Sequence, residues 1–221
     1  MLDPGPFGTT CARVGCMPSK LLIAAADAAF HAGEAHVFGV DAQPRVDGRR
    51  VMERVRRERD RFVGFVQEDI EEHLTQGRLV PQRANFLDRN TLSVGEQPLR
   101  FRTAVIATGS TPFVPPPFRG IPVISNDEVF DWEDLPSSVL VVGSGVIGLE
   151  LGQALHRLGV RVTIVGNRGV VGPLSDPVVR AEARRVFSDE LDLRPDYVLH
   201  DVQPHAQGVR VLSDDQDQVF E

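Results

Sequence analysis

The sequence has only two cysteines, no long apolar run and no excess of basic residues. Two thiols, Cys11 and Cys16, cannot form the disulfide framework of a small secreted domain. Apolar stretches such as residues 139–142 are far shorter than the ~20 residues that cross a bilayer, so no membrane span is expected. Acidic residues outnumber basic ones by 31 to 24, which argues against nucleic acid as a partner. The first six residues lack a signal-peptide pattern, so a cytoplasmic location is expected.

The composition is that of a globular protein. Of the 221 residues, 42% are hydrophobic and 25% are charged, which excludes a disordered or collagen-like chain. A chain of this length corresponds to one or two domains and buries roughly two-thirds of its unfolded surface on folding. A hydrophobic core is therefore expected without the help of disulfide bridges.

The first half of the chain predicts two helices and a small β-meander. An alanine-rich stretch that begins with Pro18 predicts a helix over residues 18–31. Apolar residues at helical spacing predict a long amphipathic helix over residues 48–75. Its arginines are expected to form a solvated face: Arg54, Arg56, Arg57, Arg59 and Arg61. Alternating patterns predict short strands at 78–86, 91–94 and 99–106, and this meander would lead into a strand at residues 104–107.

The second half of the chain has a different pattern. A proline-rich stretch over residues 112–122 cannot continue a helix or a central strand, so we place a linker and a domain boundary there. Strand, glycine turn, helix and strand follow at 139–142, 143–148, 149–158 and 160–165, which is a βαβ unit. A helix at 177–189, strands near 197–202 and 208–212 and a hairpin tip at 214–217 complete the prediction. Phe130 and Trp132 are expected to pack at the domain junction.

The glycine turn of this βαβ unit fits the pattern G-x-G-x-x-G over residues 143–148. It follows an apolar strand and opens an amphipathic helix, which is the context that a dinucleotide-binding fingerprint requires. Gly143 would allow the tight turn, Gly145 the approach of a pyrophosphate and Gly148 close packing of helix on strand. With Val146 and Ile147, these residues would offer free N–H groups to the anion. The alternative is a glycine-rich turn that binds no nucleotide.

The residues after the second strand of the unit bear on the choice of nucleotide. An acid there usually binds the ribose hydroxyls of NAD, whereas an arginine accommodates the 2′-phosphate of NADP. The sequence has Asn167 and Arg168 at this place and no acid. The choice between NAD and NADP therefore stays open.

Cys11 and Cys16 form a C-x4-C pair. In an unbroken helix this separation puts the Cα atoms more than ~8 Å apart, beyond the ~7 Å limit for a disulfide, so a bridge requires a bent backbone. Gly15 supplies flexibility, and Pro18 places Cys16 at or just before a helix start, where the dipole favours a thiolate. Two unpaired structural cysteines or half of a metal site are the alternatives. Only His31 and His36 are nearby imidazoles, so a zinc site is not favoured.

The segment G-T-T-C-A-R-V-G-C-M-P-S-K at residues 8–20 resembles the redox-active disulfide segment of the pyridine nucleotide-disulfide oxidoreductases. Among them the pattern of the dihydrolipoamide dehydrogenases fits best. Ala107, Thr108 and Gly109 resemble the A-T-G strand end of this family, and residues 139–165 resemble its nicotinamide-nucleotide unit. The resemblance implies an α/β, Rossmann-like FAD- and NAD(P)-binding fold with a small β-meander. Its two domains would be incomplete: a partial FAD-binding domain at 1–122 and a partial NAD(P)-binding domain at 123–221.

The resemblance also implies roles for single residues. Cys11 would exchange with the dithiol substrate, and Cys16 would lie over the flavin as a charge-transfer thiolate. Lys20 would lie near flavin N5 with Glu150 as its acidic partner, a pair that would keep the ammonium charged and oriented. Residues 107–109 would approach the adenosine half of FAD.

Parts of the family pattern do not occur in the chain, namely the first phosphate-binding glycine motif, the later flavin segment and the C-terminal interface domain. We therefore expect a fragment that is weakly active or inactive alone, with homodimerisation a property of a longer parent. The parent would pass electrons from dihydrolipoamide, free or on a lipoyl domain, through the cysteines and FAD to NAD. One alternative is an NADPH-dependent reductase of a disulfide or a metal ion. Another is a non-catalytic nucleotide-binding fragment.

Overall fold

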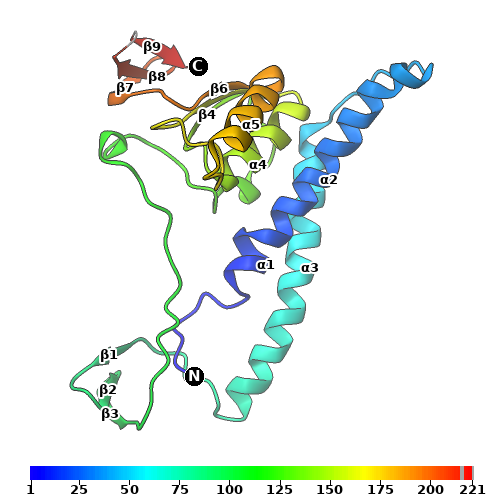
Figure 1. Ribbon diagram of the computed structural model, residues 1–221. Coiled ribbons are helices and arrows are strands. Elements are labelled where there is room, and N and C mark those ends of the chain that lie inside the picture. The colour runs from blue at the N-terminus through cyan, green and yellow to red at the C-terminus, as the bar shows by residue number, and fades with distance from the viewer. Residues whose placement is uncertain (215–216, 221) are drawn as a thin grey trace.

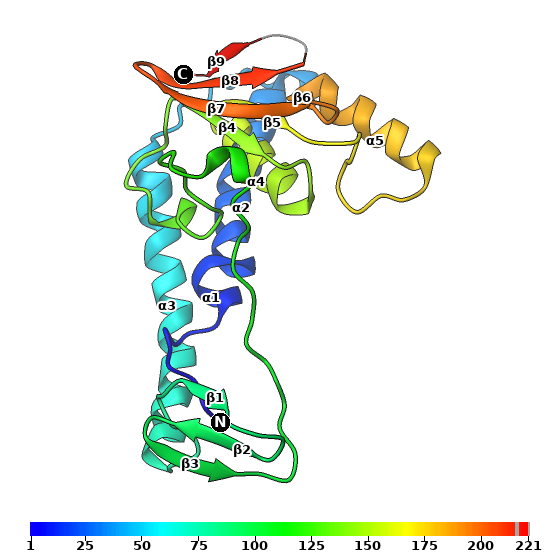
Figure 2. The ribbon, with the colours of Figure 1, turned by 90° about the vertical axis from the view of Figure 1, so that its left-hand side faces the viewer.

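The structure, a computed structural model, describes residues 1–214 and 217–220. Two long helices lie side by side and form the axis of the molecule (Figure 1). A three-stranded meander lies at one end of this axis and an α/β unit at the other (Figure 2). An extended segment connects these two ends and runs apart from the helices in both views.

The first half supplies the helices. α1 (Thr10–Val14) is followed directly by α2 (Cys16–Gly33), and a 3-10 turn η1 (Glu34–Phe38) leads toward α3 (Gly48–Thr75). The long amphipathic helix predicted over residues 48–75 is confirmed at both ends, and the helix predicted over 18–31 is longer by about one half-turn at each end. Asp47 caps α3 by accepting a hydrogen bond from the N–H of Arg50.

The prediction of a fully solvated arginine face on α3 is wrong for two of its five members. Arg56 and Arg59 are partly buried and donate to main-chain oxygens, Arg56 to Trp132 and Arg59 to Phe130. Arg59 also pairs with Asp131 at 2.5 Å, and its side chain is only 13% exposed. The sequence could not show this, because the acceptors belong to the distant 3-10 turn η3 (Val129–Asp131) and to Trp132, which follows it. Arg54, Arg57 and Arg61 are exposed, as predicted, although Arg54 also donates to the Leu21 oxygen.

The first meander contains β1 (Ala84–Phe86), β2 (Thr91–Val94) and β3 (Gln97–Arg100), all antiparallel. The predicted strand at residues 104–107 is not formed, and β3 ends before it. Val105 and Ile106 are 88% and 70% exposed. A strand needs a hydrogen-bonding neighbour, and none of the described strands pairs with this segment.

The proline-rich segment contains only a short 3-10 turn, η2 (Pro116–Phe118). Phe118 is buried and anchors the segment against the second half of the chain. Further along, Phe130 in η3 is 1% exposed and Trp132 packs beside it, so packing at this junction is confirmed.

The second half contains the predicted βαβ unit: β4 (Ser138–Val142), α4 (Val146–Arg157) and β5 (Arg161–Val165). After α5 (Pro177–Glu190), a three-residue strand β6 (Asp192–Arg194) extends the parallel sheet in the order β4-β5-β6. The sequence analysis missed β6, because three residues are too few for a periodic signal.

A second antiparallel meander ends the chain, with β7 (Leu199–His205), β8 (Gly208–Ser213) and β9 (Gln218–Phe220). The hairpin tip predicted at 214–217 includes residues 215 and 216, which lie outside the described residues. No helix in the described ranges has the length and apolar character that a membrane crossing requires.

One hydrophobic core joins the two halves. It includes Leu22 and Ala26 of α2, Met52 and Val55 of α3, and much of α4 and β5. Ala26 of α2 and Ala154 of α4 are buried at 1% and 3% exposure. Small side chains let helices approach closely, so α2 packs tightly against α4 as well as α3.

Two helical glycines give a matched test of this packing. A Cβ at Gly148 in α4 would overlap the carbonyl oxygen of Gly143, whereas a Cβ at Gly64 in α3 would meet open space. We expect Gly148→Ala to lower the free energy of unfolding by about 1–3 kcal/mol through backbone displacement. Gly64→Ala should raise it by about 0.5–1 kcal/mol. Urea titrations measure both, and a Gly148→Ala variant as stable as the original would contradict the tight turn.

Candidate functional site

The cysteine pair lies at a sharp break between α1 and α2. The backbone of Gly15 has φ −126° and ψ −118°, and a Cβ there would stand 3.1 Å from the Thr10 oxygen and 3.3 Å from the Cys11 Cα. A side chain at this position would therefore crowd the preceding helix. The predicted bend is confirmed, and Cys16 is the first residue of α2, as its position before Pro18 indicated.

Cys11 and Cys16 are both free and exposed. The two thiols are hydrogen-bond partners, and this bond raises the pKa of the Cys11 thiol above its usual value. Backbone N–H groups of Cys16 and Met17 at the start of α2 oppose the rise. Two exposed thiols that interact in this way are the reduced form of a pair that oxidation could close. The disulfide itself stays a prediction.

Lys20 lies one turn after Cys16 on the same face of α2 and forms an ion pair with Glu150 of α4. The structure thus brings together two side chains that are 130 residues apart. The Lys20 side chain is 65% exposed and that of Glu150 is 26% exposed. An exposed pair contributes little to stability, about 0–1 kcal/mol. Lys20 is also the only lysine in a chain with 23 arginines, a signal that the sequence analysis missed.

The glycine turn has the geometry that its motif predicts. Gly143 has φ +123°, and its N–H bonds the Val165 oxygen at 2.8 Å. Gly145 is the N-cap of α4, and the first intrahelical bond runs from Leu149 to Gly145. The N–H groups of Val146, Ile147 and Gly148 precede that bond and face the helix N-terminus. Val146 and Ile147 are each 54% exposed, so an anion can reach this first turn.

Ser144, inside the glycine motif, is a structural residue that the sequence analysis did not single out. It is 2% exposed, its hydroxyl donates to the Val170 oxygen at 2.5 Å, and its own carbonyl accepts from Gly172 at 2.8 Å. These bonds hold the glycine turn against the loop that follows β5. A small polar residue between two motif glycines is the signal that could have revealed it.

Asn167 and Arg168 lie in that loop, beside the carboxyl ends of β5 and β6. The N–H of Gly166 bonds the Arg194 oxygen at 2.9 Å, and the N–H of Gly169 bonds the Pro195 oxygen at 3.0 Å. Both Asn167 and Arg168 are exposed, and Arg168 has a left-handed φ of +58°. Within the described part of the chain, the guanidinium of Arg168 has no acidic partner.

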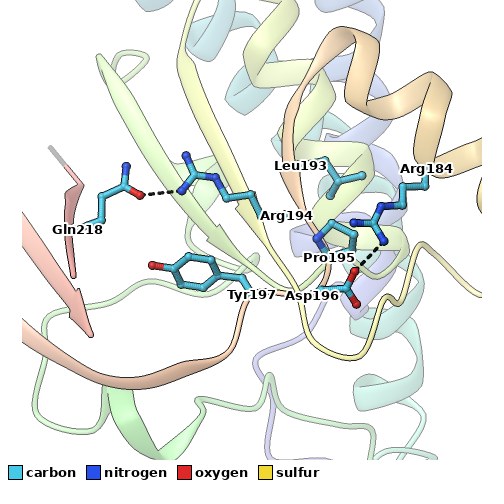
Figure 3. A pocket seen from close by; sticks show the side chains of 7 residues that line it. All are labelled: Arg184, Leu193, Arg194, Pro195, Asp196, Tyr197 and Gln218. Carbon is cyan, nitrogen blue, oxygen red and sulfur yellow. Dashed lines mark hydrogen bonds and ion pairs between the residues drawn. The ribbon is translucent and has the colours of Figure 1, made fainter. Parts of the chain in front are cut away.

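A cavity of about 380 Å³ opens next to this loop (Figure 3). Arg184 pairs with Asp196 at 2.6 Å on one side, and Arg194 bonds Gln218 at 2.6 Å on the other. The hydroxyl of Tyr197, the only tyrosine, is buried and has no hydrogen-bond partner among the described residues. Local sequence patterns gave no sign of the cavity, because its walls come from α5, β6, the segment that follows β6, and β9. They are Arg184, Leu193, Arg194, Pro195, Asp196, Tyr197 and Gln218.

The remaining predicted site residues, Ala107, Thr108 and Gly109, lie in the exposed extended segment. Gly109 has φ +70°, which fits a turn at a strand end, but the strand before it is not formed. Their contact with a flavin stays a prediction. Within the described ranges, no three His, Cys, Asp or Glu side chains are grouped as metal ligands.

The contact between the thiols gives a prediction about reactivity. Because the hydrogen bond with Cys16 raises the pKa of Cys11, removing that partner in Cys16→Ala should lower the pKa of Cys11. The alkylation rate of Cys11 should then reach half of its maximum at a lower pH than in the original chain. Iodoacetamide labelling followed by peptide mass spectrometry measures this. An unchanged or higher midpoint would mean that the Cys16 thiol does not raise the pKa of Cys11.

The chain is similar to known proteins in sequence and in fold. A model of the family "Pyridine nucleotide-disulphide oxidoreductase" matches residues 2–221. Dihydrolipoyl dehydrogenase 2 from Haloarcula marismortui is 31% identical over 231 aligned residues, which cover 99% of this chain and 48% of that protein. Mycothione reductase from Mycobacterium tuberculosis is 31% identical over 223 residues, which cover 96% of this chain and 48% of that protein.

Solved structures show the same fold. LpdA from Mycobacterium tuberculosis superposes with a TM-score of 0.75 at 22% identity, over 97% of this chain and 49% of that one. A Cu(II) complex of the flavoprotein disulfide reductase RclA from Escherichia coli gives 0.74 at 19% identity, over 98% and 48%. The chain thus spans about half the length of the proteins it matches. Since the family model covers nearly every residue, this chain belongs to the pyridine nucleotide-disulphide oxidoreductase family.

Proposed function

We propose that the chain forms the redox and nucleotide-binding part of a flavin-dependent dithiol–disulfide oxidoreductase of the dihydrolipoyl dehydrogenase type. The observation that carries the proposal is the ion pair of Lys20 with Glu150, one helical turn from the Cys11–Cys16 contact. The pair is too exposed to matter much for stability, yet it uses the only lysine of the chain. A role of the Lys20 ammonium beside a redox cofactor would explain this arrangement.

The residues fit the reactive end of FAD. Cys16 and Lys20 are four residues apart on one exposed face of α2, so a planar ring system can reach both a sulfur and an ammonium. Bound FAD would accept two electrons from the thiols and pass them to a nicotinamide. Cys11, the outer thiol, would exchange with the dithiol substrate, whose oxidation to a disulfide releases two electrons and two protons. Glu150 would keep Lys20 charged and oriented.

The nucleotide would lie across the carboxyl edge of the parallel sheet. Its pyrophosphate would take the free N–H groups of residues 146–148, and its adenosine end would extend toward Asn167, Arg168 and the neighbouring cavity. The preferred substrates by family are dihydrolipoamide, free or on a lipoyl domain, and NAD. Activity and homodimerisation belong to the whole enzyme, and we expect the chain alone to be weakly active or inactive.

A second candidate function is an NADPH-dependent reductase of a disulfide or a metal ion. The observation in its favour is Arg168, which is exposed, unpaired among the described residues and positioned where a 2′-phosphate is bound in NADP-dependent folds. Among the matched proteins, one is named mycothione reductase and another structure is titled a Cu(II) complex.

The first experiment is the visible absorption spectrum of the chain reconstituted with FAD. We expect Cys11→Ser to show a long-wavelength charge-transfer band, because it leaves the thiolate of Cys16 beside the flavin. Cys16→Ser should show no such band, even with an anaerobic dithiol. Equal spectra would contradict the assigned roles. A chain that binds nicotinamide nucleotide but no flavin would be a non-catalytic binding fragment.

The second experiment separates the two nucleotides. If Arg168 binds a 2′-phosphate, Arg168→Gln should weaken NADPH binding about tenfold or more and leave NADH binding unchanged. Arg185→Gln, which removes an exposed arginine of α5 that already pairs with Glu182, is the matched control for overall charge. Calorimetry measures the six affinities, those of the original chain and of the two variants for each nucleotide. Equal losses for both nucleotides would remove the case for NADP.

A further inference from the structure

Two ion pairs connect α2 with α4 in the same register. Lys20 pairs with Glu150, and seven residues further along both helices Asp27 pairs with Arg157 at 2.9 Å. Seven residues are about two helical turns, so both pairs lie along one side of each helix. Their polarity is opposite: the cation belongs to α2 in the first pair and to α4 in the second. A seven-residue slip of α4 would place Arg157 opposite Lys20, which like charges disfavour.

The space between the two pairs is narrow and mostly apolar. A cavity of only about 50 Å³ lies there, lined by residues of both helices: Ile23, Ala26, Asp27, Glu150, Gln153, Ala154 and Arg157. Ala26 and Ala154 are almost fully buried. Alanine side chains are short and interdigitate little, so these two residues give the helices little resistance to sliding. The polar contacts at the two ends therefore add to the hydrophobic core in fixing the register of the helices.

The two pairs differ in how firmly they are built. The Arg157 side chain is 19% exposed and binds Glu190 of α5 through two nitrogens, at 2.6 and 3.3 Å. Its guanidinium also lies 4.1 Å above the ring of Phe30 of α2. Gln153 binds Glu190 at 2.7 Å, and, although burial acts in the opposite direction, hydrogen bonds from Arg157 and Gln153 hold the pKa of Glu190 below its usual value. Lys20 has one ionic partner and is 65% exposed.

We propose that Arg157 is a positioning residue, which fixes α2 against α4 in the register that keeps Lys20 in contact with Glu150. The firm contact of Arg157 with Asp27 and Phe30 holds the far end of the helix pair. The exposed ion pair of Lys20 with Glu150 can then form at the other end, although it is too weak to hold the helices together by itself. This inference rests on the proposed function, because it explains how that function's ammonium is kept in place.

Arginine suits this role for a chemical reason. Its planar fork can bind Glu190 through two nitrogens, reach Asp27 with another group and stack on Phe30 at the same time. A lysine at this position would keep the positive charge but lose the planar guanidinium that binds Glu190 through two nitrogens and stacks on Phe30. Arg157→Lys therefore tests the guanidinium more specifically than a variant that removes the charge.

The test uses the chain alone and its single lysine. A carbodiimide condenses a carboxylate with a neighbouring amine, with loss of water and without a spacer, so Lys20 and Glu150 should form a cross-linked peptide that mass spectrometry identifies. Glu150→Gln should abolish this product and thereby establish its identity. No flavin, nucleotide or dithiol is present, so the result can be read even if the proposed redox function fails.

We expect Asp27→Asn to lower the yield of the Lys20–Glu150 cross-link severalfold, measured on folded protein well below its melting temperature. Arg157→Lys should lower it too. Arg185→Gln, which breaks an exposed ion pair within α5, should leave it unchanged. If Arg157 served stability alone, the first two variants would melt earlier but give the original yield, and that outcome would overturn the proposal. If Asp27→Asn does not fold, the yield of Arg157→Lys decides.

Discussion

The packing of α2 against α4 is the contact on which the rest of the molecule depends. α2 begins with Cys16 and carries Lys20 one turn later, whereas α4 begins at the glycine turn and carries Glu150 in its first turns. Buried alanines on both helices let them approach closely, and one core continues from α3 through α2 into the parallel sheet. This core therefore joins two helix N-termini with different chemistry, the thiols at the start of α2 and the exposed first turn of α4.

Stability and the proposed function depend on different residues of the contact between α2 and α4. The apolar core and the half-buried contacts of Arg157 supply the energy that holds the helices together. The pair of Lys20 with Glu150 adds little, because water screens it. Among the 24 lysine and arginine residues of the chain, Lys20 is the only one with a primary amine, and it lies one helical turn after Cys16. An ammonium is a compact charge that arginine does not replace.

Local signals in the sequence predicted the parts of the fold that local interactions determine. The helix over residues 48–75, the glycine turn and the bend at Gly15 each follow from spacing and backbone freedom, and all three are present. The predictions failed where the structure depends on contacts between residues that are far apart in the sequence. Residues 104–107 have strand-forming side chains but no neighbouring strand, and Arg59 finds its acceptors in η3. Tyr197 and its cavity depend on three elements that only the tertiary fold brings together.

The two centres of the candidate site differ in how they are held. The glycine turn is fixed by short-range bonds within the second half, from Ser144 to Val170 and from Gly143 to Val165. The ammonium of Lys20 is instead oriented by a contact between α2 and α4, across 130 residues of sequence. A change in the contact between α2 and α4 should therefore disturb the proposed redox centre more than the glycine turn. In the proposed function electrons pass between these two centres, so the contact between α2 and α4 would set the geometry of transfer and the glycine turn the affinity for the nucleotide.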